Sequence, residues 1–153
     1  MPRPQVGDPA PAFEAPDQNG KIRSLHEFKG QRLVLYFYPK DDTPGCTAEA
    51  CSLRDHYQSL LQAGYQILGV SSDTPASHQK FIAKFQLPFD LISDQDKTVH
   101  EAFGTWIQKS MYGRSYMGTD RVTFVIGPDG IIQEVIAKVD TKNHSAQILA
   151  ALA

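Results

Sequence analysis

The apolar run over residues 33–38 most strongly constrains how this chain can fold. Its β-branched and aromatic side chains are typical of a buried strand, which Pro39 ends. After the turn-forming pair Pro44 and Gly45, apolar residues return at helical spacing. A buried strand, a short turn and a helix in succession predict a layered α/β structure, with Cys46 near the amino end of the helix.

The rest of the chain alternates strand and helix patterns. An amino-terminal hairpin is expected around Asn19-Gly20, and a loop over 113–118. Strands are predicted over 65–71, 91–93, 121–126 and 131–136. Helices are predicted over about 47–63, 75–85, 94–103 and 142–152. Strand–helix–strand units favour parallel pairing, and the late hairpin adds antiparallel strands. The expected fold class is α/β and thioredoxin-like, with a mixed central sheet, helices on both faces and an N-terminal hairpin.

Length and composition exclude several kinds of protein. A chain of 153 residues without repeats or low-complexity segments predicts a single domain over 1–153. The 15 Lys and Arg are scattered and the formal charge is −2, so no nucleic-acid partner is expected. The start lacks the apolar core of a signal peptide, and no run reaches the roughly 18 apolar residues of a membrane span. We expect a cytoplasmic protein with no membrane partner.

Cys46 is the leading candidate for chemistry. Free backbone N–H groups and the dipole at a helix start favour a thiolate over a thiol. The preceding polar turn, residues 41–45, indicates an exposed or cleft position, so we favour a reactive cysteine over an inert buried one. Thr43 is equally well interpreted as a turn residue or as a hydroxyl that donates to an oxygen held beside the sulfur.

Cys51, the second of the two cysteines, follows Cys46 by five residues. In an ideal helix this spacing separates the two Cα atoms by roughly 8.6 Å, whereas a disulfide needs less than about 7 Å. The pair can therefore form a disulfide only if that helical turn unwinds, and core packing is the alternative role for Cys51. Two Cys and five dispersed His show no zinc-site spacing, so neither a metal nor a cofactor is expected.

The segment Pro39…Thr43-Pro44-Gly45-Cys46 resembles the P-x-x-x-T-x-x-C signature of peroxiredoxins. The longer run over 38–51 is similar to the bacterioferritin comigratory protein (BCP, or PrxQ) branch, and matching pieces at 7–13, 69–71 and 112–124 extend the likeness over nearly the whole chain. This resemblance implies an atypical two-cysteine peroxidase, expected to be a monomer. Its implied substrates are hydrogen peroxide and organic hydroperoxides, and its implied reductant is thioredoxin or a similar dithiol.

The resemblance also assigns roles to particular residues. Cys46 would be the peroxidatic nucleophile and Cys51 the resolving cysteine. Thr43 would donate to the peroxide and Pro39 would shield the pocket. Arg121 would be the cation beside the thiolate, although from the sequence alone a surface cation at a strand end is as good an interpretation.

Two further residues have weaker claims to the substrate pocket. Glu49 could orient Arg121, but a favourable acid in the first helical turn is slightly preferred. Trp106 could wall an apolar mouth together with Tyr112 and Tyr116, although aromatic residues in such a segment more often simply pack.

The histidines are not expected to act in catalysis: His56 and His78 are placed on exposed helix faces, and His26, His100 and His144 in or near turns. A cysteine-protease interpretation is disfavoured for the same reason. A general thiol–disulfide oxidoreductase is disfavoured because the spacing is Cys-x4-Cys rather than Cys-x2-Cys. A redox-sensing module whose two cysteines switch a helix stays open as the non-enzymatic alternative.

Overall fold

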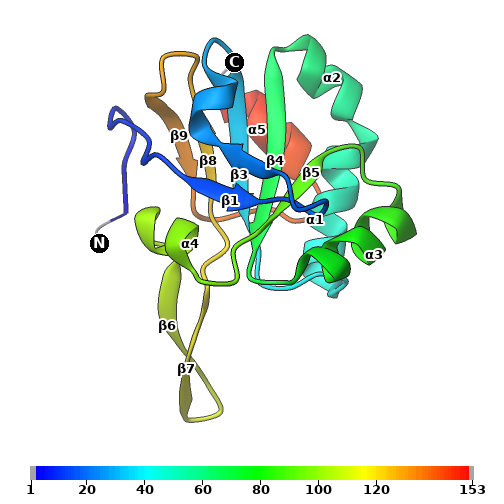
Figure 1. The fold of residues 1–153 in the computed structure, drawn as a ribbon, viewed down its shortest axis with the longest axis vertical. Helices are drawn as coiled ribbons and strands as arrows, with labels where there is room; N and C mark the ends of the chain where they lie inside the picture. The colour runs from blue at the N-terminus through cyan, green and yellow to red at the C-terminus, as the bar shows by residue number, and fades with distance from the viewer. Residues whose placement is uncertain (1–2, 152–153) are drawn as a thin grey trace.

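A five-stranded mixed sheet forms the centre of the molecule (Figure 1). The computed structural model describes residues 3–151. The strands lie in the order β5-β4-β3-β8-β9, with bounds Asp90–Ser93, Tyr65–Ser71, Arg32–Phe37, Thr123–Ile126 and Ile132–Ile136. β3, β4 and β5 run parallel, whereas β8 is antiparallel to both β3 and β9. The predicted mixed sheet is confirmed.

Each face of the sheet has its own apolar core, because successive side chains of a strand point to opposite faces. On β3, Val34 and Tyr36 belong to one core, and Leu33 and Leu35 to the other. The first core lies beneath α1 (Pro44–Asp55), α2 (Tyr57–Gln62), α3 (Pro75–Phe85) and α5 (His144–Ala151). The second lies beneath the hairpin β1 (Glu14–Pro16) and β2 (Ile22–Ser24), the 3-10 helix η1 (Leu25–Phe28) and α4 (Thr98–Ala102). Helices on both faces and the N-terminal hairpin are therefore confirmed.

The helix predicted over 75–85 is observed as α3, with the same bounds. The Thr74 hydroxyl oxygen accepts a hydrogen bond from the Ser77 backbone N–H at 3.1 Å, and Pro75 occupies the first helical position. An N-cap threonine and a proline in the first turn both favour a helix start at this point.

The helix predicted over 47–63 is wrong at its start and in its continuity. Thr43 is an extended N-cap and Pro44 begins α1, so Cys46 lies inside the first turn. The helix is interrupted at His56, whose backbone has φ −115° and ψ 20°, before α2 continues. The earlier start places Glu49 in the second turn rather than the first.

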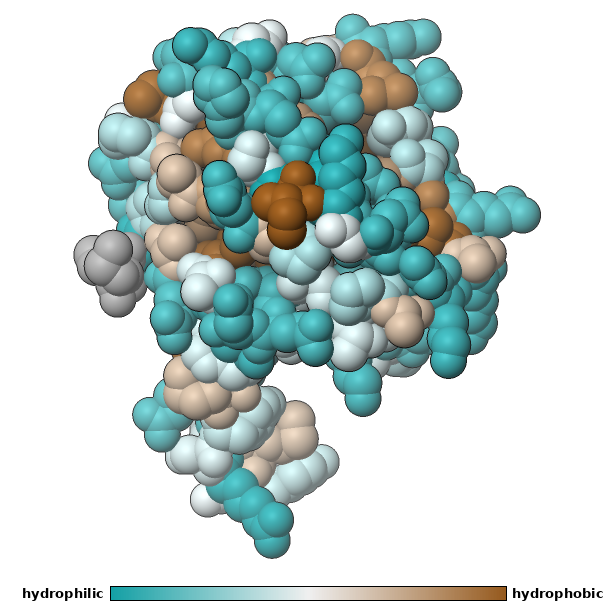
Figure 2. Space-filling view, viewed as in Figure 1, coloured by the Kyte–Doolittle hydropathy of each residue, from teal (hydrophilic) through white to brown (hydrophobic). Residues whose placement is uncertain are grey.

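Residues 113–118, expected to be a loop, instead form most of a strand. β6 (Trp106–Met111) and β7 (Arg114–Thr119) make a hairpin that extends away from the rest of the molecule (Figures 1 and 2). Tyr112 and Gly113 form its two-residue turn with φ of 53° and 77°, the positive values that such a turn requires. Both strands are largely exposed, so the alternation of polar and apolar residues that marks a half-buried strand is absent.

Two other predicted helices are shorter in the structure. The helix predicted over 94–103 begins only at residue 98, as α4, after Lys97 in the left-handed region with φ 65°. The Asp94 carboxylate accepts hydrogen bonds from two backbone N–H groups in its first turn. α5 begins at His144, and the predicted end at residue 152 lies outside the described residues. Over residues 3–151, the helices are too short or too polar to cross a lipid bilayer.

Candidate active site

Cys46 is held in the first turn of α1, directly after the loop that follows β3. The Thr43 carbonyl accepts the first helical hydrogen bond, from the Thr47 N–H at 2.8 Å. The Cys46 side chain is only 1% exposed and belongs to the core beneath α1. The cysteine is therefore buried rather than exposed, although Pro44 beside it is exposed.

Arg121 brings a cation to this sulfur from 75 residues further along the chain. Its Nη2 donates to Cys46 Sγ at 3.3 Å. The following residue, Val122, accepts a backbone hydrogen bond from Phe37 N–H at 2.9 Å, which fixes the arginine beside the end of β3. A Cβ atom at position 45 would lie 3.2 Å from Nη2, so Gly45 leaves the space that the guanidinium occupies.

Glu49 lies on the other side of the guanidinium. Its Oε1 accepts a hydrogen bond from Arg121 Nη1 at 2.6 Å, and the carboxyl group is fully buried. Burial raises the pKa of Glu49 to about 7, and the neighbouring Arg121 charge opposes that rise. The preferred interpretation of Glu49 as a first-turn acid is wrong, and the alternative contact with Arg121 is observed.

Thr43 and Pro39 complete the loop before Cys46. The Thr43 hydroxyl donates to the Lys40 carbonyl at 2.8 Å, so it closes the loop in this conformation. Pro39 is half-buried directly after β3. Both residues belong to the short segment that leads from the sheet to the sulfur.

Cys51 lies in the same unbroken helix as Cys46, and both thiols are free. It is half-buried, so it is neither a fully exposed surface thiol nor a fully buried core residue. Because α1 is continuous from residue 44 to residue 55, the ideal-helix separation of roughly 8.6 Å applies to the two Cα atoms. A disulfide between them requires that this helix open.

Trp106 lies at the start of β6, where its ring packs against α4. The ring meets His100 edge-on at 5.6 Å between centroids, and Lys97 Nζ lies 5.0 Å from its centre. Tyr112 at the hairpin tip is 97% exposed. These contacts agree with the packing interpretation of Trp106.

Three histidines are buried, which the sequence did not suggest. His78, His100 and His144 are all fully buried, so the expected exposed position is wrong for His78, whereas His100 and His144 do lie near turns. His26 and His56 are exposed, and for His56 this agrees with the prediction. The buried rings are hydrogen-bonded by groups from distant segments, such as Asp41 at His78 and Thr123 at His144, which a local pattern cannot reveal.

His144 belongs to the candidate site. Its Nε2 lies 3.5 Å from Glu49 Oε2, the carboxyl oxygen that Arg121 does not contact. It sits at the first position of α5, where its neighbours in sequence give no sign of a partner on α1. A role for His144 in the site was therefore not predicted from the sequence.

A second buried polar cluster, formed by Asp41, Asp73 and His78, has the composition of a metal site. Its candidate ligand atoms lie within 4.8 Å of one another. However, Asp41 Oδ2 accepts from Ser77 at 2.8 Å and contacts His78 Nδ1 at 2.7 Å, and Asp73 Oδ2 accepts from the Asp41 backbone N–H at 2.8 Å. The cluster therefore acts as a hydrogen-bond network that ties the loop before Cys46 to α3.

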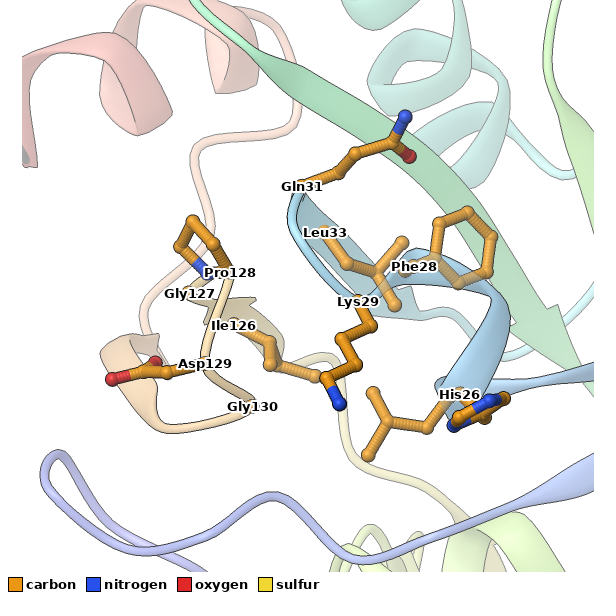
Figure 3. A pocket seen from close by; sticks show the side chains of 11 residues that line it. His26, Phe28, Lys29, Gln31, Leu33, Ile126, Gly127, Pro128, Asp129 and Gly130 are labelled. Atoms are coloured by element: carbon orange, nitrogen blue, oxygen red, sulfur yellow. The ribbon is translucent and has the colours of Figure 1, made fainter.

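A pocket of about 170 Å³ lies away from the cysteine, between η1 and the turn joining β8 to β9 (Figure 3). Lys29 lies across it, with Phe28 and Leu33 on one side and Asp129 on the other (Figure 3). Neither cysteine lines this pocket, so it contributes nothing to thiol chemistry.

Comparisons with known proteins identify the family of this chain. The AhpC/TSA family model matches residues 6–135. Peroxiredoxin Bcp of Escherichia coli is 46% identical over 145 residues, which cover 95% of this chain and 93% of that protein. The chain therefore belongs to the AhpC/TSA family.

Solved structures show the branch of the family to which the chain is similar. A PrxQ variant of Xylella fastidiosa superposes with a TM-score of 0.92 at 33% identity, covering 99% of this chain and 97% of that one. The bacterioferritin comigratory protein of Xanthomonas campestris, studied for alkyl peroxide reduction, gives a TM-score of 0.86 at 38% identity, covering 92% and 89%. Within the family, the chain is a peroxiredoxin of the BCP/PrxQ branch.

Proposed function

We propose that this protein reduces hydrogen peroxide and organic hydroperoxides with the Cys46 thiolate as its nucleophile. The 3.3 Å contact between Arg121 Nη2 and Cys46 Sγ is the main support for this activity. A guanidinium at that distance favours the charged sulfur over the neutral thiol. The alkyl peroxide activity studied in the Xanthomonas campestris relative points to the same substrate class.

In the first step the thiolate attacks the nearer oxygen of the peroxide. A sulfur–oxygen bond forms, the oxygen–oxygen bond breaks, and the leaving oxygen takes up a proton as water or an alcohol. Negative charge moves from sulfur to the leaving oxygen, and Arg121 is placed to stabilise it. In this proposal Thr43 turns its hydroxyl from the Lys40 carbonyl towards the peroxide, and Pro39 shields the sulfenic acid.

In the second step Cys51 resolves the sulfenic acid of Cys46. The Cys51 sulfur displaces hydroxide, which leaves as water, and an intramolecular disulfide results. Because α1 is continuous through both positions, this step requires local unwinding of the helix. Thioredoxin or a similar dithiol then reduces the disulfide by exchange and is itself oxidised.

A coupled assay tests the proposed cycle. Peroxide, thioredoxin, thioredoxin reductase and NADPH are mixed with a small amount of the wild-type chain, and NADPH consumption is followed. We expect consumption to continue over many equivalents of protein. Consumption that stops after one equivalent would instead support a redox sensor, whose single oxidation has no catalytic cycle.

The variant Cys51→Ser separates the two steps. We expect a single-turnover rate of Cys46 oxidation within about twofold of wild type, and a thioredoxin-linked rate lower by about tenfold or more, because no neighbouring thiol forms the disulfide. Mass spectrometry should detect an accumulated sulfenic acid in this variant. Normal recycling without that species would remove the resolving role from Cys51.

A further inference from the structure

One oxygen of the Glu49 carboxyl group takes no part in the contact with Arg121. Oε1 accepts from Arg121 Nη1 at 2.6 Å, whereas Oε2 is buried without a hydrogen-bond partner. His144 Nε2 faces Oε2 at 3.5 Å, and both side chains are fully buried. A buried polar atom without a hydrogen-bond partner costs folding free energy, so the position of the imidazole opposite Oε2 needs a physical explanation.

The hydrogen bonds of Gln147 determine which nitrogen of the His144 ring carries the hydrogen. The Gln147 Nε2 donates to the Lys138 carbonyl at 2.7 Å, and its Oε1 accepts from the Asp140 backbone N–H at 3.0 Å. The same oxygen faces His144 Nδ1 at 2.8 Å, so Nδ1 must carry a hydrogen. In the neutral ring Nε2 is then an acceptor with one lone pair, and it faces the Thr123 hydroxyl at 2.8 Å and Glu49 Oε2 at 3.5 Å. Any further proton on the ring is bound at Nε2.

Two acidic groups on α1 share a single cation. Cys46 and Glu49 are three residues apart on the helix, which places them on the same face. Arg121 donates to both side chains. An ionised carboxyl group beside the sulfur would disfavour the thiolate. A proton held at Oε2 removes that charge while Oε1 continues to accept from the guanidinium.

We propose that His144 is a positioning residue for Cys46 and Arg121, and that it acts by sharing one proton with Glu49 Oε2. This inference rests on the peroxidase function proposed above. Whether the proton is on Oε2 or on Nε2, the net charge of the pair is zero. A neutral pair leaves the charge of Arg121 available to the sulfur.

The directions of the two pKa shifts agree with this arrangement. Burial raises the pKa of Glu49 to about 7, against the influence of Arg121. Burial also lowers the pKa of His144, with Arg121 adding to the effect and Gln147 and Asp140 opposing it. Below neutral pH the proton therefore resides mainly on the carboxyl group, with His144 Nε2 opposite it.

The other ionisable groups around the pair do not replace it. Burial, and then the charges of Glu49 and Cys46, raise the pKa of Tyr36 on β3 well above its usual value, so this phenol stays neutral. Asp140 acts on His144 from the far side of the ring, through the segment that precedes α5. Among these described neighbours, Glu49 and His144 are therefore the groups that bind an exchangeable proton near neutral pH.

The pH midpoint of Cys46 alkylation by iodoacetamide tests the proposal, with Cys51→Ser present so that a single thiol reacts. His144→Asn keeps a donor towards Gln147 but removes Nε2. We expect the midpoint to rise by about one pH unit, because Glu49 then loses its proton at lower pH and its charge opposes the thiolate. Alkylation needs no peroxide, so this test can fail independently of the proposed activity.

His100→Asn is the matched control, since His100 is equally buried and its Nε2 also contacts a threonine hydroxyl, that of Thr119 at 2.8 Å. We expect this control to leave the midpoint unchanged. Glu49→Gln mimics the protonated carboxyl group, so it should not raise the midpoint, and adding His144→Asn to it should have no further effect. An unchanged midpoint in folded His144→Asn, or a rise that persists with Glu49→Gln, would overturn the proposal.

Nitrogen NMR of the His144 ring gives a second test that does not depend on substituting this residue. We expect hydrogen on Nδ1 in the neutral ring, and a different pH midpoint for the ring in wild type and in Glu49→Gln. Identical titrations in the two proteins, or a neutral ring with hydrogen on Nε2, would contradict the shared proton even if His144→Asn does not fold.

Discussion

Replacing Cys46 with serine should abolish peroxide consumption, lowering the rate by about 10⁴-fold or more. Serine has nearly the size of cysteine, and it retains a hydroxyl group in the first turn of α1. That hydroxyl group is not ionised at neutral pH, so the attacking anion is lost. The measurement is the single-turnover oxidation of the protein by hydrogen peroxide, followed by intrinsic fluorescence or mass spectrometry.

Cys51→Ser is the natural control for this variant, because it makes the same chemical change five residues along the same helix. It should retain the first oxidation that Cys46→Ser loses. Peroxide consumption by folded Cys46→Ser at a rate near that of wild type would show that the nucleophile lies elsewhere in the chain.

Replacing Arg121 with glutamine should lower the rate of Cys46 oxidation by about 10²–10³-fold. The substitution removes the positive charge that contacts the sulfur at 3.3 Å. Loss of that charge disfavours an anion at the sulfur and reduces stabilisation of the leaving oxygen. Stopped-flow oxidation of wild type and variant at neutral pH measures the difference.

Two further arginine variants test whether the effect on the rate depends on the shape and the position of the Arg121 side chain. Arg121→Lys keeps the charge but lacks the fork that contacts Cys46 and Glu49 together, so an intermediate rate is expected. Arg114→Gln removes an exposed arginine on β7 and should leave the rate unchanged. Equal rates for wild type and Arg121→Gln would exclude a catalytic role for this cation.

The fold could be predicted from the sequence where the local preferences of the residues agree with the tertiary structure. The apolar run before Pro39 is observed as β3, and Pro75 lies in the first turn of α3 as expected. The hairpin β6–β7 was missed because its strands are mostly exposed and thus carry no two-residue periodicity. Its turn did contain a usable signal, since a glycine at position 113 suits the positive φ found there.

The candidate site was predictable only in part. The turn before Cys46 and the spacing to Cys51 identify the thiols from local sequence, whereas the position of Arg121 depended on resemblance to a family. Glu49 follows Cys46 by three residues, but no short-range pattern connects it to Arg121 or His144, which lie 72 and 95 residues further along the chain. Burial of a carboxyl group and an imidazole together is a property of the packed helices α1 and α5, not of either segment alone.

Measuring whether the Cys46 sulfur is ionised at neutral pH tests the proposed thiolate chemistry most directly. The far-ultraviolet absorbance of the thiolate, taken as the difference between wild type and Cys46→Ser, is followed as pH is raised from acid to alkaline. Cys46 should be mostly ionised at pH 7 in wild type and mostly protonated at the same pH in Arg121→Gln. A sulfur that is protonated at pH 7 in wild type, or that titrates identically in the two proteins, would contradict the role of Arg121.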